Sequence, residues 1–83
     1  MDRFRRIVQK FASQPRKITV ADVVRLLEML GYTERKNPGN HRVFHKKGSS
    51  VVTVPTVSGR SLKKQYIRQL VKRLELEEYL ENS

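Results

Sequence analysis

Apolar residues recur at helical spacing in two stretches of the chain and predict its two main helices. The first stripe consists of Val20, Val23, Val24, Leu27 and Leu30. Thr19 and Asp22 flank the start of this stripe and resemble a capping box, with Asp in place of the usual Glu. Gly31 stands where a helix C-terminus favours a left-handed residue. We therefore predict a helix over about residues 19–30.

The second apolar stripe lies nearer the C-terminus. It consists of Leu62, Tyr66, Ile67, Leu70, Val71 and Leu74. The other side of this helix is basic and carries Lys63, Lys64, Arg68, Lys72 and Arg73. Ser61 is the predicted N-cap, and residues 77–81 are compatible with a short final helical turn.

Between the two helices, short β-prone segments alternate with turn signals. The predicted strands are residues 32–36, 41–47 and 50–54. Asn37-Pro38-Gly39-Asn40 separates the first two strands, and Gly48-Ser49 forms a tight hairpin turn between the last two. Because the connections are short, the three strands are expected to form an antiparallel sheet.

The N-terminal segment has a helical pattern of its own. Phe4, Ile7, Val8 and Phe11 fall on one side, and basic residues occupy much of the remainder. Pro15 ends the segment, because proline disfavours helix in the residue before it. Two interpretations stay open, a short docking helix and a basic arm. A basic amphipathic segment lying on an anionic membrane ranks third.

The order of helix, three strands and helix predicts an α+β fold. A three-stranded antiparallel sheet packed on two helices has the α-β-β-β-α order of the double-stranded-RNA-binding domain. We expect residues 1–17 to form an N-terminal basic amphipathic extension with an extra helical segment, and residues 18–83 to form the domain. Fold order alone does not establish function.

The charge balance changes the picture, since it points to a polyanionic partner. Eighteen Lys and Arg stand against eight Asp and Glu in 83 residues, for a net charge of +10. Four of the acids lie in the last nine residues, so residues 1–74 carry eighteen positive and four negative charges, or +14. Such an excess favours RNA or DNA through phosphate contact. A DNA-binding role ranks low, because no helix-turn-helix pattern is evident.

Other classes are excluded or disfavoured by composition. The chain has no cysteine, which excludes disulfides and Cys-ligated zinc. No stretch approaches the ~18–20 apolar residues of a membrane span, and the basic start lacks the apolar run of a secretory signal. A cytoplasmic location is therefore expected. A chain this short is also expected to carry its chemistry on an open face rather than in a deep cavity.

The candidate chemistry centres on His41. The two histidines, His41 and His45, fall on one side of the same predicted strand, too far apart to chelate one metal ion. His41 follows Gly39, which permits close backbone approach, and Asn40. An imidazole can take the proton of an RNA 2′-hydroxyl as a general base, while cations stabilise the crowded phosphate. This chemistry needs no metal or other cofactor.

Several motifs together resemble the HicA (YcfA-like) family of messenger-RNA interferase toxins. The runs that carry the resemblance, in chain order, are Val24, Leu27, Leu30-Gly31-Tyr32, Gly39-Asn40-His41-Arg42-Val43-Phe44, Thr53-Val54-Pro55, Gly59, Leu62-Lys63-Lys64 and Ile67-Arg68-Gln69-Leu70. The likeness covers about residues 18–80. It implies a double-stranded-RNA-binding-like fold, an endoribonuclease activity in which His41 is the catalytic residue, and a HicB antitoxin as partner.

On this hypothesis the toxin cleaves messenger RNA, and neighbouring residues hold the RNA. The predicted RNA-binding residues are Gly39, Asn40, Arg42, Lys46, Lys47, Lys63 and Lys64. The chain departs from the family where Asn40 replaces Ser, Arg42 replaces a frequent second His, and Val57 replaces a further His. These departures leave His41 without an obvious second acid. The alternative is a non-catalytic RNA-binding domain of the same fold, which recognises RNA by shape.

Overall fold

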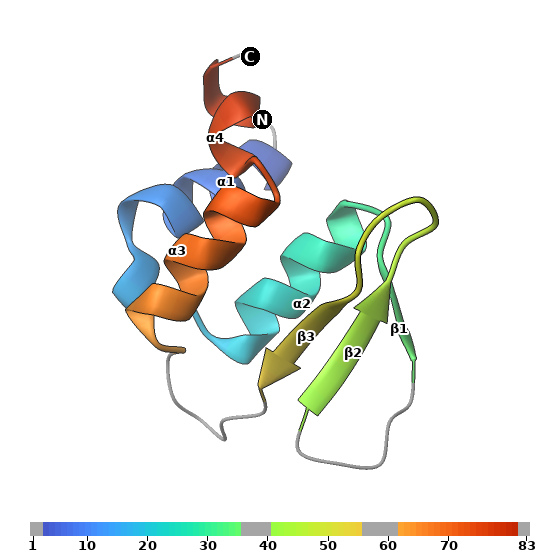
Figure 1. Ribbon diagram of the computed structural model, residues 1–83. Helices are drawn as coiled ribbons and strands as arrows, with labels where there is room; N and C mark the ends of the chain where they lie inside the picture. Colours follow the sequence, from blue (N-terminus) through green and yellow to red (C-terminus); the bar gives the residue numbers. More distant parts are fainter. Residues whose placement is uncertain (1–2, 36–40, 56–61, 82–83) are drawn as a thin grey trace.

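The computed structural model describes residues 3–35, 41–55 and 62–81 (Figure 1). Its helices are α1 (Arg3–Ser13), a single 3₁₀ turn η1 (Pro15–Lys17), α2 (Val20–Met29), α3 (Lys64–Arg73) and α4 (Leu76–Glu81). Its strands are β1 (Thr33–Arg35), β2 (His41–His45) and β3 (Val52–Pro55). The protein is therefore α+β, and the order of helix, three strands and helix is confirmed.

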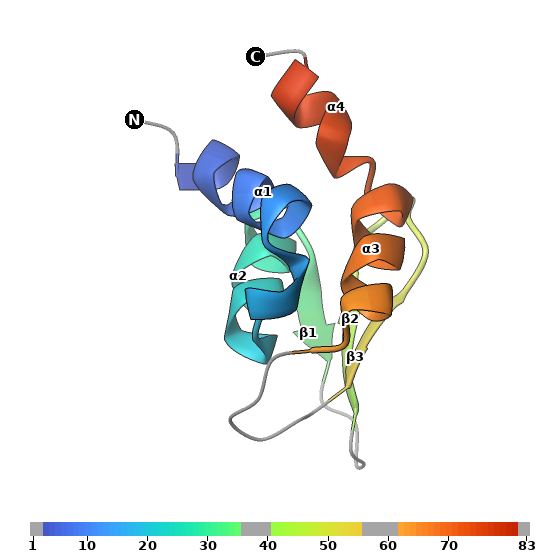
Figure 2. The same ribbon diagram turned by 90° about the vertical axis from the view of Figure 1, so that its left-hand side faces the viewer.

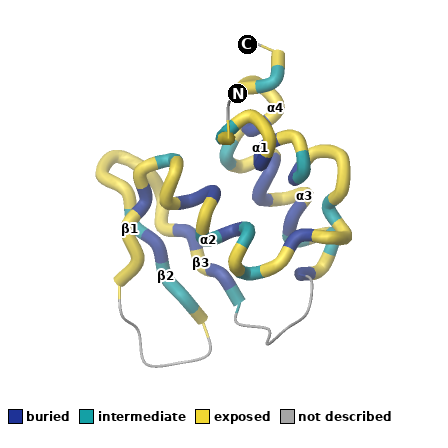
Figure 3. The backbone as a smooth tube through the Cα atoms, turned by 180° about the vertical axis from the view of Figure 1, so that it is seen from behind, coloured by how far each residue is buried: buried dark blue, intermediate teal, exposed yellow. Residues whose placement is uncertain are grey.

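The three strands form one antiparallel sheet in the order β1-β2-β3. Helix α2 lies over one face of this sheet (Figure 1), and α3 lies next to β3 (Figure 2). Helix α1 contacts α2, α3 and α4, and it lies on the side of α2 away from the sheet (Figure 2). The buried residues gather where the helices meet the sheet (Figure 3). One face of the sheet thus remains uncovered by any described helix.

Helix α2 begins at the predicted capping box. The side-chain oxygen of Thr19 accepts a hydrogen bond from the Asp22 backbone N–H at 3.3 Å, and the Thr19 backbone N–H donates to Asp22 Oδ2 at 3.0 Å. At the other end, Gly31 has a φ of +94°, the left-handed conformation that the sequence predicts there. Both ends of α2 are therefore determined by local signals, a side-chain cap at Thr19 and the backbone conformation of Gly31.

Helix α3 begins later than predicted. Its N-cap position is occupied by Lys63, whose side chain makes no capping hydrogen bond, and the predicted cap Ser61 lies outside the described residues. The Leu62 backbone N–H donates to the Ile18 carbonyl oxygen at 2.8 Å, and the Leu62 side chain is buried. This contact holds the chain extended against residue 18, so the prediction of Ser61 as the cap was wrong.

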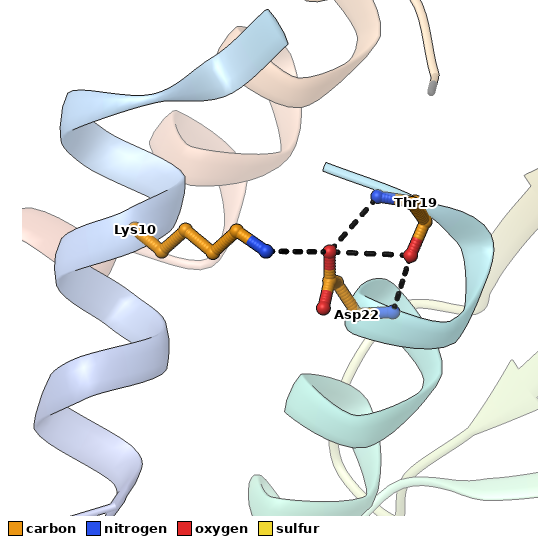
Figure 4. Close-up of polar contacts among 3 residues, drawn as sticks. All are labelled: Lys10, Thr19 and Asp22. Atoms are coloured by element: carbon orange, nitrogen blue, oxygen red, sulfur yellow. Dashed lines mark hydrogen bonds and ion pairs between the residues drawn. The ribbon is translucent and has the colours of Figure 1, made fainter. Parts of the chain in front are cut away.

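The N-terminal segment is a packed helix, which decides between the two interpretations left open by its sequence. Ile7, Val8 and Phe11 of α1 belong to the buried core. Lys10 Nζ lies 3.2 Å from Asp22 Oδ2, the same oxygen that accepts from the Thr19 backbone N–H and hydroxyl (Figure 4). Helix α1 is thus held both by apolar burial and by an ion pair to the cap of α2.

The acid at this junction has a perturbed ionisation. Burial by itself raises the pKa of Asp22, but the hydrogen bond from the Thr19 backbone N–H and the ion pair with Lys10 outweigh that effect. Together they hold the pKa of Asp22 below its ordinary value of 3.8. The carboxylate therefore stays charged and keeps both α1 and the first turn of α2 in place.

The β3 edge of the sheet is covered by side chains of α3. Tyr66 Oη donates to the Thr53 carbonyl oxygen at 2.8 Å, and Arg73 Nη2 donates to the Val51 carbonyl oxygen at 2.6 Å. An edge strand exposes alternate backbone groups that can pair with another chain. These two hydrogen bonds satisfy the carbonyl of Thr53 in β3 and that of Val51 just before it, and they attach α3 to the sheet. Burial raises the pKa of the Tyr66 phenol to about 12, against a lowering by Arg73.

Candidate functional site

His41 is the first residue of β2 and its side chain is exposed. Side chains alternate along a strand, so His41, Val43 and His45 share one face and Arg42 and Phe44 the other. Phe44 is fully buried under the helices. The His41 side of the sheet is therefore the uncovered one. We call it the open face: His41, Val43 and His45 of β2 with the residues paired to them, Thr33, Arg35, Thr53 and Pro55.

Both histidines lie on the open face, as the sequence predicts, but they are not neighbours. Four residues of strand separate them by ~13 Å at about 3.3 Å per residue. His45 is half-buried and His41 is exposed. One phosphate bound at His41 therefore cannot also contact His45, and the pair does not form an acid–base couple on a single phosphodiester.

Arg42 points away from His41 although the two are adjacent in sequence. Its Nε and Nη2 donate to the two carboxylate oxygens of Glu34 at 2.6 and 2.5 Å, and its guanidinium carbon lies 5.8 Å from the Phe44 ring centroid. The hydrogen bond with Glu34 raises the pKa of Arg42 above its ordinary value. Arg42 can reach a phosphate held at His41 only by breaking its pair with Glu34.

The other predicted RNA-binding residues fall into separate groups. Lys46 and Lys47 follow the far end of β2 from His41, and Lys46 Nζ lies 5.6 Å from the Tyr32 ring centroid. Lys63 and Lys64 lie at the start of α3. Gly39 and Asn40 lie outside the described residues. The structure therefore does not bring the predicted cations together around His41.

A cation that sequence reasoning passed over lies on the open face. Arg35 of β1 pairs with Val43 of β2, and directly opposed residues share a face of the sheet. Val43 is the next open-face residue after His41, so Arg35 is the diagonal neighbour of His41 across the β1–β2 pair. Arg35 is exposed. Only the strand register reveals this pairing, because Arg35 and His41 are separated by the predicted turn.

The described residues hold no group of three or more His, Cys, Asp or Glu side chains placed to bind a metal ion. None of the helices described is both long and apolar enough to cross a membrane. The open face is instead a partly exposed strip on which His41 has Arg35 as its diagonal neighbour. Such a strip can bind an extended anionic chain and move a proton at one point along it.

Comparison with known proteins identifies the family to which the chain belongs. A family model described as the HicA toxin of bacterial toxin-antitoxin matches residues 20–76, which is more than half of the chain. Comparisons with curated proteins and with solved structures give no match. The matched range contains α2, the whole sheet and α3, with His41 at the start of β2. The chain therefore belongs to the HicA toxin family, and it acts as a toxin whose partner is an antitoxin.

Proposed function

We propose that this toxin is an endoribonuclease that cleaves messenger RNA with His41 as its catalytic residue. The observation that carries the proposal is the exposed imidazole of His41 on the open face of the sheet. The family membership and the net charge of +10 support it. The substrate and the location in the cytoplasm, where messenger RNA is translated, are part of the same proposal.

The reaction is an internal transfer at phosphorus. The His41 imidazole, as general base, takes the proton of an RNA 2′-hydroxyl. The 2′-oxygen then bonds to the adjacent phosphorus, and the bond from phosphorus to the 5′-oxygen breaks. The 5′-oxygen leaves with a proton from the imidazolium or from water. The products are a 2′,3′-cyclic phosphate and a 5′-hydroxyl end, so no metal-activated water is required.

Arg35 supplies the cation that this step needs. Arg35 is on the same face as His41, and its partner on β2 is Val43, the next residue of β2 on that face. A guanidinium in this position can donate two hydrogen bonds to the non-bridging oxygens of the phosphate and stabilise their charge in the transition state. Arg42 is committed to Glu34 on the opposite face, so it is not assigned this role.

The proposed partner is a HicB-like antitoxin that covers the open face. A protein that presents acidic groups to this surface would compete with RNA for Arg35 and would shield His41 from the substrate. No described helix covers the open face, so a partner can reach it without a rearrangement of the fold.

The decisive experiment is gel-resolved cleavage of a long unstructured RNA in the presence of EDTA. Wild type is compared with His41→Ala and Arg35→Gln, and with the matched controls His45→Ala and Arg25→Gln. We expect His41→Ala to reduce the cleavage rate by about 10²–10⁴-fold and Arg35→Gln by up to about a hundredfold. Each control removes the same type of side chain at a position that does not reach a phosphate held at His41, and should retain most of the activity.

A different result would favour the second candidate, a non-catalytic RNA-binding domain. The separation of His41 from His45 is the observation in its favour, because no second histidine is in reach to act as the acid. If wild type and His41→Ala both retard the RNA equally and neither cuts it, the enzyme proposal fails. The open face would then be a binding surface only.

A further inference from the structure

A groove lies between the N-terminal helical segment and α3. Its volume is about 1040 Å³, and it opens to the surface. One wall is the end of α1 with η1, from Phe11 to Lys17, and the other is the outer side of α3 with the start of α4. Helix α1 and η1 precede the residues matched by the family model, so this groove is a feature that the added segment builds.

Charge divides the groove into two halves. The half between η1 and α3 is basic and is lined by Arg16, Lys17, Lys64, Arg68 and Lys72. The other half, where α3 passes into α4, is acidic and is lined by Glu75, Glu77 and Glu78. None of the five cations forms an ion pair with a residue in the described ranges. The basic half is therefore an array of cations with no acid of the described residues within ion-pairing distance.

The cations of this half lie close enough to repel one another. The positive charge of Arg68, and after it that of Arg16, lowers the pKa of the Lys64 amine below its ordinary value of 10.5. Arg16 comes from η1 and Arg68 from α3, so the repulsion acts across the groove. An anion placed between the two walls would relieve it.

The floor of the groove distinguishes between kinds of partner. Its large apolar residues, Phe11 and Val71, are only 1% and 9% exposed, because they already pack in the core. A docked protein helix normally inserts large apolar anchors into a pocket, and the two large apolar residues of this floor are already covered by the core. A nucleic-acid backbone needs only cations and an open channel. The groove therefore fits a phosphate chain better than a peptide.

The position of the groove connects it to the open face. The first turn of α3 and the start of β2 lie at the same end of the molecule in both views (Figures 1 and 2). An RNA strand that crosses this end can contact His41 on the sheet and the basic half of the groove on the helices. The acidic half would repel the strand, so it limits the contact to the end that carries His41.

We infer that the basic half of this groove, with Arg16 on one wall and Arg68 on the other, is a second RNA-backbone site separate from the open face. The site adds affinity and does not take part in bond breaking. This inference rests on the proposed RNA substrate, and it assigns a function to the N-terminal segment that precedes the family-matched residues.

The test measures binding of a labelled single-stranded RNA over a range of salt concentrations. All proteins carry His41→Ala so that the RNA stays intact. The groove variant Arg16→Gln/Arg68→Gln is compared with the control Arg3→Gln/Arg5→Gln, which removes two exposed charges from α1 outside the groove. We expect the groove variant to weaken binding about tenfold. Its plot of log affinity against log salt should become shallower by about 1.4, or about 0.7 for each phosphate that the variant no longer neutralises.

The outcomes separate the inference from the proposed function. Equal affinities and salt slopes for the groove and control variants would overturn the inference, and an acidic protein segment would become the candidate occupant. The same two double substitutions in a chain that keeps His41 give a second readout. The groove variant should cut at the wild-type rate once RNA is saturating. Absence of cutting by wild type itself would count against the enzyme proposal and would leave the groove result intact.

Discussion

The two faces of strand β2 perform different tasks with alternate residues of one five-residue segment. On the helix-covered face, Phe44 is fully buried and Arg42 is locked to Glu34. On the open face, His41 is exposed and Arg35 of the neighbouring strand lies diagonally beside it. The covered face supplies stability, and the proposed RNA cleavage is assigned to the open face. Substitutions on the covered face should therefore act mainly on stability, and substitutions on the open face should act mainly on RNA cleavage.

The largest effect on stability is expected from Phe44→Ala. Removing a fully buried aromatic side chain typically costs about 3–5 kcal/mol, partly because a cavity is left behind. The control Val43→Ala, one residue away on the open face, should cost about 1 kcal/mol or less. Chemical denaturation measures both. If Phe44→Ala does not fold, Phe44→Leu keeps the test usable, with a smaller loss that should still exceed that of Val43→Ala.

The next effect concerns the acid that joins α1 to α2. Because the pKa of Asp22 is lower in the folded protein than its ordinary value of 3.8, its ionised form stabilises the fold above about pH 4. That contribution is lost as the pH falls through the folded-state pKa. Asp22→Asn should cost about 1 kcal/mol at pH 7 and should flatten the stability profile between pH 5 and pH 2 relative to wild type.

Cleavage per folded molecule should not change in Asp22→Asn, because Asp22 is on the helix side. A fall in cleavage without a fall in folded fraction would show that the two sides of the sheet are coupled. Lys10→Gln provides a matched variant, since it removes the ion pair and leaves the capping box intact.

A smaller effect is expected at the sheet edge. Tyr66→Phe removes the hydrogen bond to the Thr53 carbonyl and should cost about 1 kcal/mol. Because the folded-state pKa of Tyr66 is raised to about 12, the neutral phenol stabilises the fold fully below about pH 10. This contribution is lost as the pH rises from 10 towards 12. Thermal unfolding of both proteins across this range should show a weaker alkaline loss for Tyr66→Phe.

The smallest effect is expected from Arg42→Gln. The Arg42 and Glu34 side chains are each 36% exposed, and ion pairs at such positions are worth about 0–1 kcal/mol. Stability should change by no more than this, and the cleavage rate should stay near that of wild type. A drop in the cleavage rate as large as that of Arg35→Gln would contradict the division of roles between the two faces of β2. Arg42 would then be an RNA-binding residue, as the sequence predicts.

Much of the fold could be predicted because its signals are local. The Thr19–Asp22 capping box and the left-handed Gly31 depend on contacts within one helical turn, and the structure has both. The Gly48 turn follows the same rule, with a φ of +81°. The alternation along β2 also placed His41 and His45 on one face without knowledge of the partner strands. The cap of α3 was missed because a distant contact of Leu62 with Ile18 delays the helix.

The sequence by itself determined the α+β order, the basic character of the chain and the identity of His41 as the candidate base. Tertiary structure decided which cation lies nearest that candidate base, because Arg35 pairs with Val43 through strand register and Arg42 is turned to Glu34 on the other face. It also decided that residues 3–13 dock against α2 and α3 and create the groove. Periodicity reports which side of an element is apolar. Which element packs against that apolar side depends on contacts between residues far apart in the chain. Those contacts form only when the whole core packs.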